Sequence, residues 1–556
     1  MELDRAIDTL TSALVSYGRE AGWIPELFGE DEVDLLEAAR LDIFQRIKLP
    51  FRSYWAWQLA AASEYGSTWK VPCPDLRRSD VVKLAQYGRE LGLSVELQES
   101  DQVMYDISAE RDTLNASLSK RFADGLKRRF YHMLPSVDPP SGHGSERILY
   151  EDFYPNNVHV MTPLYKGLEC CADVNQVYVS LRPSVDRELR HAEITSFPLY
   201  RCRPEGRRDL DAWTAKYADR IHLYVERWVA EAWPVSWVRP TNELQADIAR
   251  VTVHALERAH DYSGRFRRVL DVFRPTTVVV STDFSVDARV LELLARQRGI
   301  RSVSIQHGLF YEKVRPKYFL ADEICVWGSY HAKFFEGLPD RQERVVITGS
   351  PKHDRLRERA ANNPRRERPL IVYASTPITI SPGLSRNDYV KTVKDVVHAS
   401  KAMPHCDFVV KMHPSENPYF ARQLCIRFGA GANLCVTDEE NVYDLIEQSS
   451  AVIVVSSTLG YEAMLMQRPV VILNLTGEDD WLPFQKHGTA LGVRKEKELP
   501  TILEQVLNVP AKKIDAARYW HDGGDALERC LSIIAGGSAE TTFKQARSEI
   551  DKCREI

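Results

Sequence analysis

The sequence predicts two doubly wound parallel α/β sheets preceded by a mainly helical N-terminal region. Short apolar strands alternate with helical stretches from about residue 146 onward, an order that favours parallel sheets covered by helices. Gly349-Ser350-Pro351 divides this alternation into two blocks, which we read as two units facing each other across a cleft. At 556 residues the chain is too long for one core, so two or three domains are expected.

The N-terminal region, residues 1–137, is predicted to be mainly helical. Apolar residues recur at helical spacing in residues 31–47 and 54–64. Residues 138–145 contain two prolines and two glycines and are read as a linker. Basic and aromatic residues are interleaved in residues 120–130, where a solvated helix face and a contact with anionic lipid are the two interpretations. The region is a candidate surface for a partner protein or for peripheral membrane association.

Residues 146–349 form the first predicted unit. Its expected strands are 148–150, 177–179, 194–197, 276–281, 302–305, 324–327 and 345–347, with helical stretches at 212–273 and 287–298. The second unit, residues 350–535, has expected strands at 370–373, 408–411, 434–436, 452–455 and 470–473. Residues 536–556 are expected to be a C-terminal helix or tail.

Composition excludes several classes of protein. The net charge of −5 and pI near 6.3 give no support for nucleic-acid binding. The first residues do not resemble a signal peptide, and no apolar run reaches the length of a membrane span. The ten cysteines are scattered without a metal-binding spacing. We expect a cytoplasmic protein, with peripheral attachment to the inner membrane face as an option.

Polar residues follow two apolar strands of the second unit. Ser456, Ser457 and Thr458 begin a helix, where free N–H groups and the helix dipole favour a phosphate. Lys411 and His413 can add charged donors from another strand end, because parallel strands deliver their loops to one edge. Helix capping by the three hydroxyls is the alternative interpretation. The pattern predicts a nucleotide-linked substrate.

Other candidates are weaker by themselves. Glu462 lies one turn inside that helix and could accept hydrogen bonds from ribose hydroxyls or be a solvated charge. Thr376 follows the first strand of the second unit, where a hydroxyl can approach the nucleotide. His307 follows a strand and precedes a glycine, a setting that suits a general base or a histidine satisfied by the backbone. Asp283 could contact an acceptor or cap a helix.

A family resemblance rests on these residues taken in order. Its motifs are Gln306-His307-Gly308, Gly349-Ser350-Pro351, Lys411-Met412-His413-Pro414, Ser456-Ser457-Thr458 and Glu462-Ala463. The order resembles bacterial GT-B glycosyltransferases of surface polysaccharide synthesis, above all capsule Kdo transferases and polysialyltransferases. The CDP-glycerol glycerophosphotransferases share a similar plan, and residues 484–492 are similar to the closing segment of GT-B domains, including UDP-GlcNAc 2-epimerases. The resemblance covers residues 146–535.

The resemblance implies a role for each matched position. His413 would contact the nucleotide phosphate and help it leave, and Ser456, Ser457 and Thr458 would hold that phosphate. Glu462 would hold the ribose, and His307 would deprotonate the acceptor hydroxyl.

The base stays open in one respect. Polysialyltransferases use an acidic motif ending in glycine, whereas Glu151-Asp152-Phe153 has phenylalanine there. Asp152 and Asp283 therefore remain alternative bases.

The resulting hypothesis is an inverting glycosyltransferase that needs no metal and no cofactor besides its nucleotide-sugar co-substrate. A CMP-sugar such as CMP-Kdo is the favoured donor, and the acceptor is a hydroxyl of a surface glycan or glycolipid. A CDP-glycerol-type polyol-phosphate transferase and a UDP-sugar 2-epimerase are the alternatives.

Overall fold

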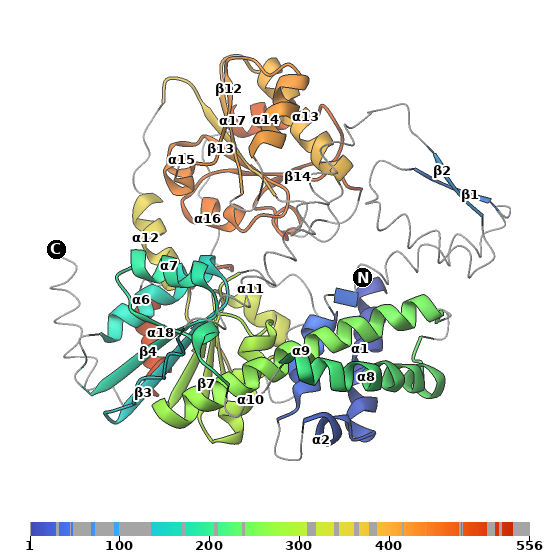
Figure 1. Cartoon of the computed structure of the whole chain (residues 1–556). Coiled ribbons are helices and arrows are strands. Elements are labelled where there is room, and N and C mark those ends of the chain that lie inside the picture. The colour runs from blue at the N-terminus through green and yellow to red at the C-terminus, as the bar shows by residue number, and fades with distance from the viewer. Residues whose placement is uncertain are drawn as a thin grey trace.

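The computed structural model shows two all-parallel sheets stacked one above the other, with helices on the faces of each (Figure 1). It describes residues 2–28, 33–44, 46–47, 68–72, 94–98, 135–169, 171, 173–204, 210–235, 240–308, 318–338, 344–360, 366–376, 386–413, 416, 418–439, 441–477, 480, 482–508, 518–521 and 525–536. The predicted fold class is confirmed.

The first sheet has seven strands in the order β5-β4-β3-β6-β7-β8-β9. Their bounds are β3 (Glu146–Asp152), β4 (Val174–Ser180), β5 (Ser196–Pro198), β6 (Thr277–Val280), β7 (Arg301–Ile305), β8 (Glu323–Val326) and β9 (Val345–Ile347). All seven strands point the same way. From the middle of the sheet, β3, β4 and β5 follow one another toward one edge, and β6 to β9 follow one another toward the other edge. This is the doubly wound order, with its switch point between β3 and β6.

The second sheet repeats the plan with six strands in the order β12-β11-β10-β13-β14-β15. They are β10 (Leu370–Ala374), β11 (Asp407–Lys411), β12 (Leu434–Thr437), β13 (Ala451–Val454), β14 (Val470–Leu473) and β15 (Leu491–Val493). Each expected strand is found. The short β15 was not predicted, because its middle residue is Gly492 and two of its three residues are not buried. The switch point lies between β10 and β13.

Helices cover both faces of each sheet. The first unit contains α6 (Val158–Leu168), α7 (Pro183–His191), α8 (Leu210–Ala232), α9 (Asn242–Phe273), α10 (Val286–Gln297) and α11 (Ser329–Ala332), with short 3-10 turns at Pro155–Asn157, Leu199–Arg201 and Lys333–Phe335. The second contains α12 (Pro351–Ala360), α13 (Arg386–Ala402), α14 (Pro418–Arg427), α15 (Val442–Gln448), α16 (Leu459–Leu465), α17 (Leu499–Asn508) and α18 (Ala526–Ile534).

Alternate residues of each strand point into different cores. Leu149 of β3 packs with the α8, α9 and α10 side, whereas its neighbours Ile148 and Tyr150 pack with α6, α7 and α18. Both faces of the central strands are therefore buried, which explains why their sequences are continuously apolar rather than alternating.

The long helical stretch expected at 212–273 is two helices, so that prediction is wrong in part. Pro234 and Pro240 lie between α8 and α9, and proline both lacks an N–H and clashes inside a helix. Thr241 caps the start of α9, because its hydroxyl accepts a hydrogen bond from the Leu244 N–H at 3.3 Å.

Helix α18 returns to the first unit. Its buried residues Cys530, Leu531 and Ile534 pack against the first sheet, although the sequence groups them with residues 350–535. Helix α12 contacts α6 of the first unit as well as α16 of the second. The two units are thus joined at the crossover and again near residue 530, and Figure 1 shows α12 and α18 at one side of the molecule.

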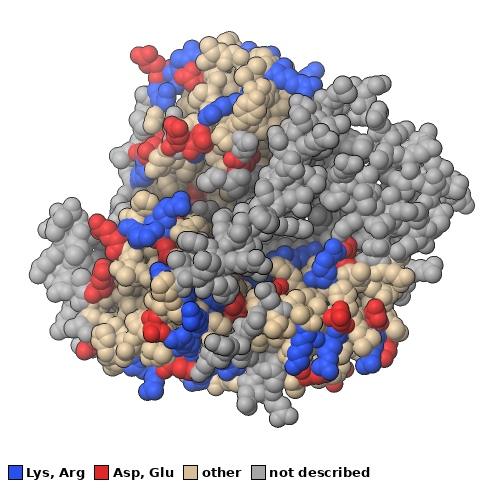
Figure 2. Space-filling view, viewed as in Figure 1, with Lys and Arg blue, Asp and Glu red and all other residues tan. Residues whose placement is uncertain are grey.

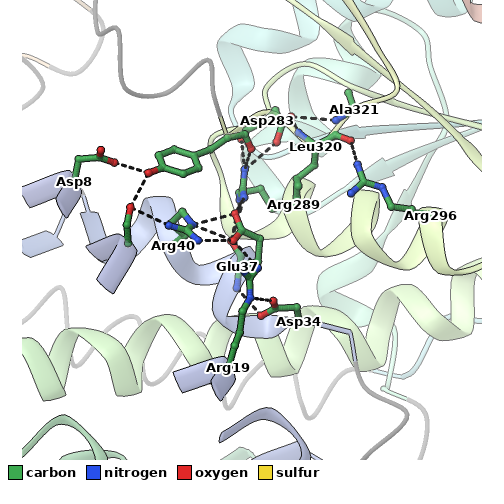
Figure 3. A network of polar contacts seen from close by, with 12 residues as sticks. Asp8, Arg19, Asp34, Glu37, Arg40, Asp283, Arg289, Arg296, Leu320 and Ala321 are labelled. Carbon is green, nitrogen blue, oxygen red and sulfur yellow. Dashed lines mark hydrogen bonds and ion pairs between the residues drawn. The ribbon is translucent and has the colours of Figure 1, made fainter. Parts of the chain in front are cut away.

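The N-terminal region is helical where it packs on the first unit. It contains α1 (Glu2–Glu20), α2 (Trp23–Phe28) and helical residues 35–44 and 46–47. Glu37, Arg40 and Arg289 form the centre of a polar network between this region and α10 (Figure 3). Residues 138–145 contain no helix or strand, as expected for the linker, and residues 54–64 and 120–130 lie outside the described part.

One feature of the N-terminal region was not predicted. Strands β1 (Thr68–Pro72) and β2 (Ser94–Gln98) pair in parallel as a separate two-stranded sheet. The described residues of this region are therefore mainly but not wholly helical.

Candidate active site

The switch point of the second sheet gathers three predicted segments. Thr376 follows β10, Ser456 to Thr458 follow β13, and these two strands are hydrogen-bonded neighbours. The loop with His413 follows β11 on the other side of β10. Since ligands of doubly wound sheets bind at the carboxyl edge beside the switch point, this is the expected position of a nucleotide.

The hydroxyl groups at this edge differ in their hydrogen bonding. Thr376 is 4% exposed, and within the described residues its Oγ1 has no hydrogen-bond partner. Ser457 Oγ accepts a hydrogen bond from the Leu459 N–H at 3.3 Å, so the capping interpretation holds for that residue. Thr458 is the N-cap residue of α16 but makes no side-chain cap hydrogen bond. Thr376 and Thr458 can therefore donate to a ligand without breaking an internal hydrogen bond.

His413 is held by its loop. Its backbone N–H donates to Glu416 Oε2 at 2.9 Å, and Ser375 Oγ donates to Glu416 Oε1 at 2.9 Å. Burial lowers the pKa of the half-buried His413 imidazole, which favours its neutral form. A neutral imidazole still offers one N–H to a departing phosphate.

Lys411 is turned in another direction. Its Nζ donates to the backbone oxygen of Asp438 at 2.8 Å, beyond β12. Strand β13, with its hydroxyls, lies two strands away on the opposite side of β11. The structure therefore does not bring Lys411 together with Ser456, Ser457 and Thr458.

Glu462 is buried, so its interpretation as a solvated charge is wrong. Its Oε1 accepts hydrogen bonds from Lys352 Nζ at 2.9 Å and from His353 Nε2 at 3.2 Å. Burial alone would raise the pKa of Glu462, but Lys352 and His353 outweigh it and lower that pKa to about 2. Its Oε2 is buried without a hydrogen-bond partner among the described residues. A ribose hydroxyl at that oxygen would complete its hydrogen bonding.

Lys352 and His353 were missed by sequence reasoning. They lie in the first turn of α12, directly after Gly349-Ser350-Pro351, and this adjacency was the only signal in the sequence. Burial by itself would lower the pKa of Lys352, yet the Glu462 carboxylate raises it. The pair ties the crossover helix α12 to α16.

His307 lies at the carboxyl end of β7 in the first sheet. Its Nδ1 is 2.6 Å from the backbone oxygen of Ser281, which follows the neighbouring strand β6. A carbonyl oxygen only accepts, so Nδ1 carries the proton and Nε2 carries the lone pair. The backbone contact therefore fixes the tautomer in which Nε2 is unprotonated. A base that accepts a proton at Nε2 requires this tautomer.

The two alternative bases are sealed in the protein. Asp152 is fully buried and accepts hydrogen bonds from Tyr178 and Ser281, and burial outweighs these bonds to raise its pKa to about 7. Asp283 is fully buried as well. Its oxygens accept from Arg289 Nη1 at 3.2 Å and from the N–H groups of Leu320 and Ala321. Both carboxyls therefore stabilise, through buried hydrogen bonds, the sheet edge that carries His307.

The two carboxyl edges meet through aromatic side chains. Trp327 follows β8 of the first sheet, and its ring centroid lies 6.3 Å from that of Tyr461 on α16 and 5.0 Å from that of Trp520. His307 and His413 thus belong to edges that adjoin at this contact. Sequence reasoning did not identify these aromatic residues.

Neither a metal-binding cluster nor a membrane-spanning helix occurs among the described residues. They contain no group of three or more His, Cys, Asp or Glu side chains placed to hold a metal ion. In the same part of the chain, every helix is too short or too polar to cross a membrane. On the face shown in Figure 2, acidic and basic side chains are interspersed over both units.

Comparison with known families gives a match within the second unit. Residues 385–476 match the family described as "Capsule polysaccharide biosynthesis protein". The matched segment runs from α13 to just beyond β14 and contains His413, the three hydroxyls and Glu462. No protein of curated function matches the sequence.

Solved structures with a similar chain path include nucleotide-sugar enzymes. S. aureus MnaA in complex with UDP is 15% identical over 70% of this chain and 96% of its own, with a TM-score of 0.45. UDP-GlcNAc 2-epimerase from Neisseria meningitidis bound to UDP-GlcNAc is 14% identical over 70% and 100%, with a TM-score of 0.49. MurG from Acinetobacter baumannii is 11% identical over 71% and 100%, with a TM-score of 0.40. The roles of individual residues do not follow from these similarities.

Proposed function

We propose that this chain is a GT-B glycosyltransferase that moves a sugar from a nucleotide-activated donor to a hydroxyl of a surface glycan or glycolipid. One observation carries the proposal. The sheet edge with a pre-oriented histidine adjoins a second edge, whose switch point carries two hydroxyls: Thr376, without a hydrogen-bond partner among the described residues, and Thr458, which makes no cap bond at the start of α16. The match of residues 385–476 to a capsule polysaccharide family supports the same class of reaction.

We propose the following reaction for these groups. His307 Nε2 removes the proton of the acceptor hydroxyl as its oxygen bonds to the anomeric carbon of the donor sugar. The bond from that carbon to the phosphate oxygen breaks on the opposite face, so the anomeric configuration inverts. The electron pair leaves with the nucleotide phosphate, where the Thr458 hydroxyl and the His413 imidazole stabilise the charge. Protein donors take the place of a metal ion in this scheme.

The donor is proposed to be a CMP-sugar such as CMP-Kdo. The support for this choice is the order of the His-Pro and Ser-Ser-Thr motifs, which resembles the capsule Kdo transferases. Glu462 would receive a ribose hydroxyl at Oε2, and Thr376 would donate to the nucleotide from β10.

A nucleotide screen tests the proposal. Thermal unfolding is measured with CMP, CDP, UDP and GDP, and a nucleotide at a hundred times its Kd should stabilise the native state by about 2.7 kcal/mol. The preferred nucleotide is then supplied as its sugar conjugate with glycan acceptors, and transfer is followed by mass spectrometry. CDP-glycerol is included as a separate donor. Failure of all four nucleotides to bind would refute the donor site, and conversion of a UDP-sugar without an acceptor would indicate an epimerase.

A further inference from the structure

Arg182 lies at the carboxyl edge of the first sheet, directly after the strand β4 and Leu181. Its guanidinium carbon is 3.4 Å from the ring centroid of Phe153, which follows β3. Stacking on an aromatic face orients a guanidinium and leaves its N–H groups at the rim available for hydrogen bonds. Arg182 is exposed, whereas Phe153 is only 6% exposed, so the ring forms a buried floor beneath the cation.

The N–H groups of Arg182 have no hydrogen-bond partner among the residues that the structure describes. Throughout the described residues its guanidinium makes no hydrogen bond and has no carboxylate within ion-pair distance. The nearby Arg258 differs, because it pairs with Asp42 at 3.1 Å and approaches Asp287 at 3.7 Å. Burial raises the pKa of both Glu151 and Asp287. Arg182 therefore forms no ion pair with the described residues at this edge, although burial lowers its pKa and Asp287 lies near enough to oppose that effect.

An exposed aromatic ring lies beside this cation. Tyr154 is 47% exposed, its ring centroid is 5.9 Å from the Arg182 guanidinium carbon, and it packs edge-on against Phe153 at 4.8 Å. An exposed tyrosine ring offers a flat apolar surface with a polar tip, which suits the face of a sugar ring.

The distance along the edge relates this group to His307. Strands β4, β3, β6 and β7 are consecutive neighbours in the sheet, and Arg182 and His307 follow the first and the last of them. Three strand spacings amount to about 14 Å. That separation exceeds the width of a single sugar ring and suits an oligosaccharide laid along the edge.

From these observations we infer that Arg182, with Phe153 and Tyr154, forms an acceptor subsite for an oxyanion, either a carboxylate or a phosphate, carried by a glycan. The inference rests on the proposed function. It adds that the acceptor glycan carries an acidic group at a distance from its reacting hydroxyl. Arg182 binds the oxyanion with two parallel N–H groups, and Tyr154 supports the adjoining sugar ring.

Calorimetric binding to the full chain tests the inference without requiring transfer. The probes are a hyaluronan tetrasaccharide, its carboxyl-reduced form and a phosphorylated disaccharide. We expect the reduced form to bind about tenfold more weakly than the acidic one, and Arg182→Gln to weaken binding of the acidic probes by about the same factor. Preference for the phosphorylated or the carboxylated probe in the wild type identifies the oxyanion.

Arg187→Gln is the matched control, because Arg187 is an exposed arginine of α7, the helix for which Arg182 is the N-cap residue. It should leave binding of every probe unchanged. Since Arg182 makes no hydrogen bond with the part of the chain that the structure describes, Arg182→Gln should fold normally, with an unchanged thermal midpoint. Equal binding of acidic and reduced probes, absence of binding by all three, or equal effects of the two variants would overturn the subsite. The donor screen is unaffected by any of these outcomes, so failure of the proposed function is detected separately.

Discussion

Arg289 of α10 and Glu37 of the N-terminal region form an ion pair of 2.8 Å between Nη2 and Oε1. Arg289 is fully buried, and it also donates to the backbone oxygens of Glu37 and Tyr318 and to Asp283. Asp283 in turn receives the N–H groups of Leu320 and Ala321. The N-terminal region is thereby connected, through one guanidinium, to both sides of the segment that contains His307.

Replacing Glu37 should weaken the attachment of the N-terminal region. Glu37→Ala leaves part of a buried guanidinium without its partner, and breaking a buried pair in this way costs about 3–5 kcal/mol. We expect faster amide hydrogen exchange in α1 and in residues 33–44, with little change in the second unit. Arg46→Ala is the control. The Arg46 side chain is exposed to solvent, so its ion pair with Asp42 should contribute less than about 1 kcal/mol to stability. Equal exchange in both variants would contradict the role of Glu37.

The assignment of the base is tested by two substitutions. His307→Ala should lower kcat by about 10²- to 10⁴-fold, the usual contribution of a general base. Nucleotide affinity should stay unchanged, because His307 belongs to the first sheet. Asp152→Asn should retain most of the activity, since the carboxyl is fully buried beneath Ser281 and Tyr178. Steady-state kinetics with saturating donor separate the two, and a larger loss in Asp152→Asn would restore Asp152 as the base.

Thr376 provides a test of the donor site that is independent of stability. Thr376→Val removes a buried hydroxyl that has no hydrogen-bond partner among the described residues, so the ligand-free protein should be equally stable or slightly more stable. Loss of one hydrogen bond to a ligand should raise the nucleotide Kd by about three- to tenfold. Calorimetry measures the affinity, and denaturation measures the stability.

Thr392→Val is the matched control for that experiment. Thr392 is equally buried in the second unit, but its Oγ1 donates to the backbone oxygen of Asp388 at 2.7 Å. Its removal should cost about 1 kcal/mol of stability and leave the nucleotide Kd unchanged. If the two variants had the same profile, Thr376 would be a structural residue only.

The sequence was sufficient for features that depend on local pattern. Continuous apolar runs such as residues 451–454 identified the central strands, and the polar residues after them could be assigned to one sheet edge because parallel strands share their direction. The separate β1–β2 pair could not be anticipated in this way, since two strands more than twenty residues apart pair only through a long-range contact.

Side-chain direction and long-range packing were also beyond sequence reasoning. Nothing local indicates that Lys411 turns toward Asp438, or that Glu462 meets Lys352 across more than a hundred residues. The return of α18 to the first sheet is a similar case, because its apolar face fits either unit. Candidate positions were therefore predicted, whereas their partners and orientations came from the structure.

The Glu462–Lys352 pair should make stability depend on acid pH. The pKa of Glu462 is lowered to about 2 in the folded protein from 4.5, so the unfolded chain binds more protons between these values and the stabilisation is lost as pH falls from about 5 toward 2. A shift of this size corresponds to about 3 kcal/mol, which Glu462→Gln should remove. Urea denaturation from pH 2.5 to 8 should show a wild-type advantage that is constant above pH 5.5 and shrinks below it. Glu496→Gln, which breaks the exposed pair with Lys394, should run parallel to wild type throughout. A difference between wild type and Glu462→Gln that stays constant down to pH 2.5 would show that Glu462 is not held as a carboxylate by Lys352.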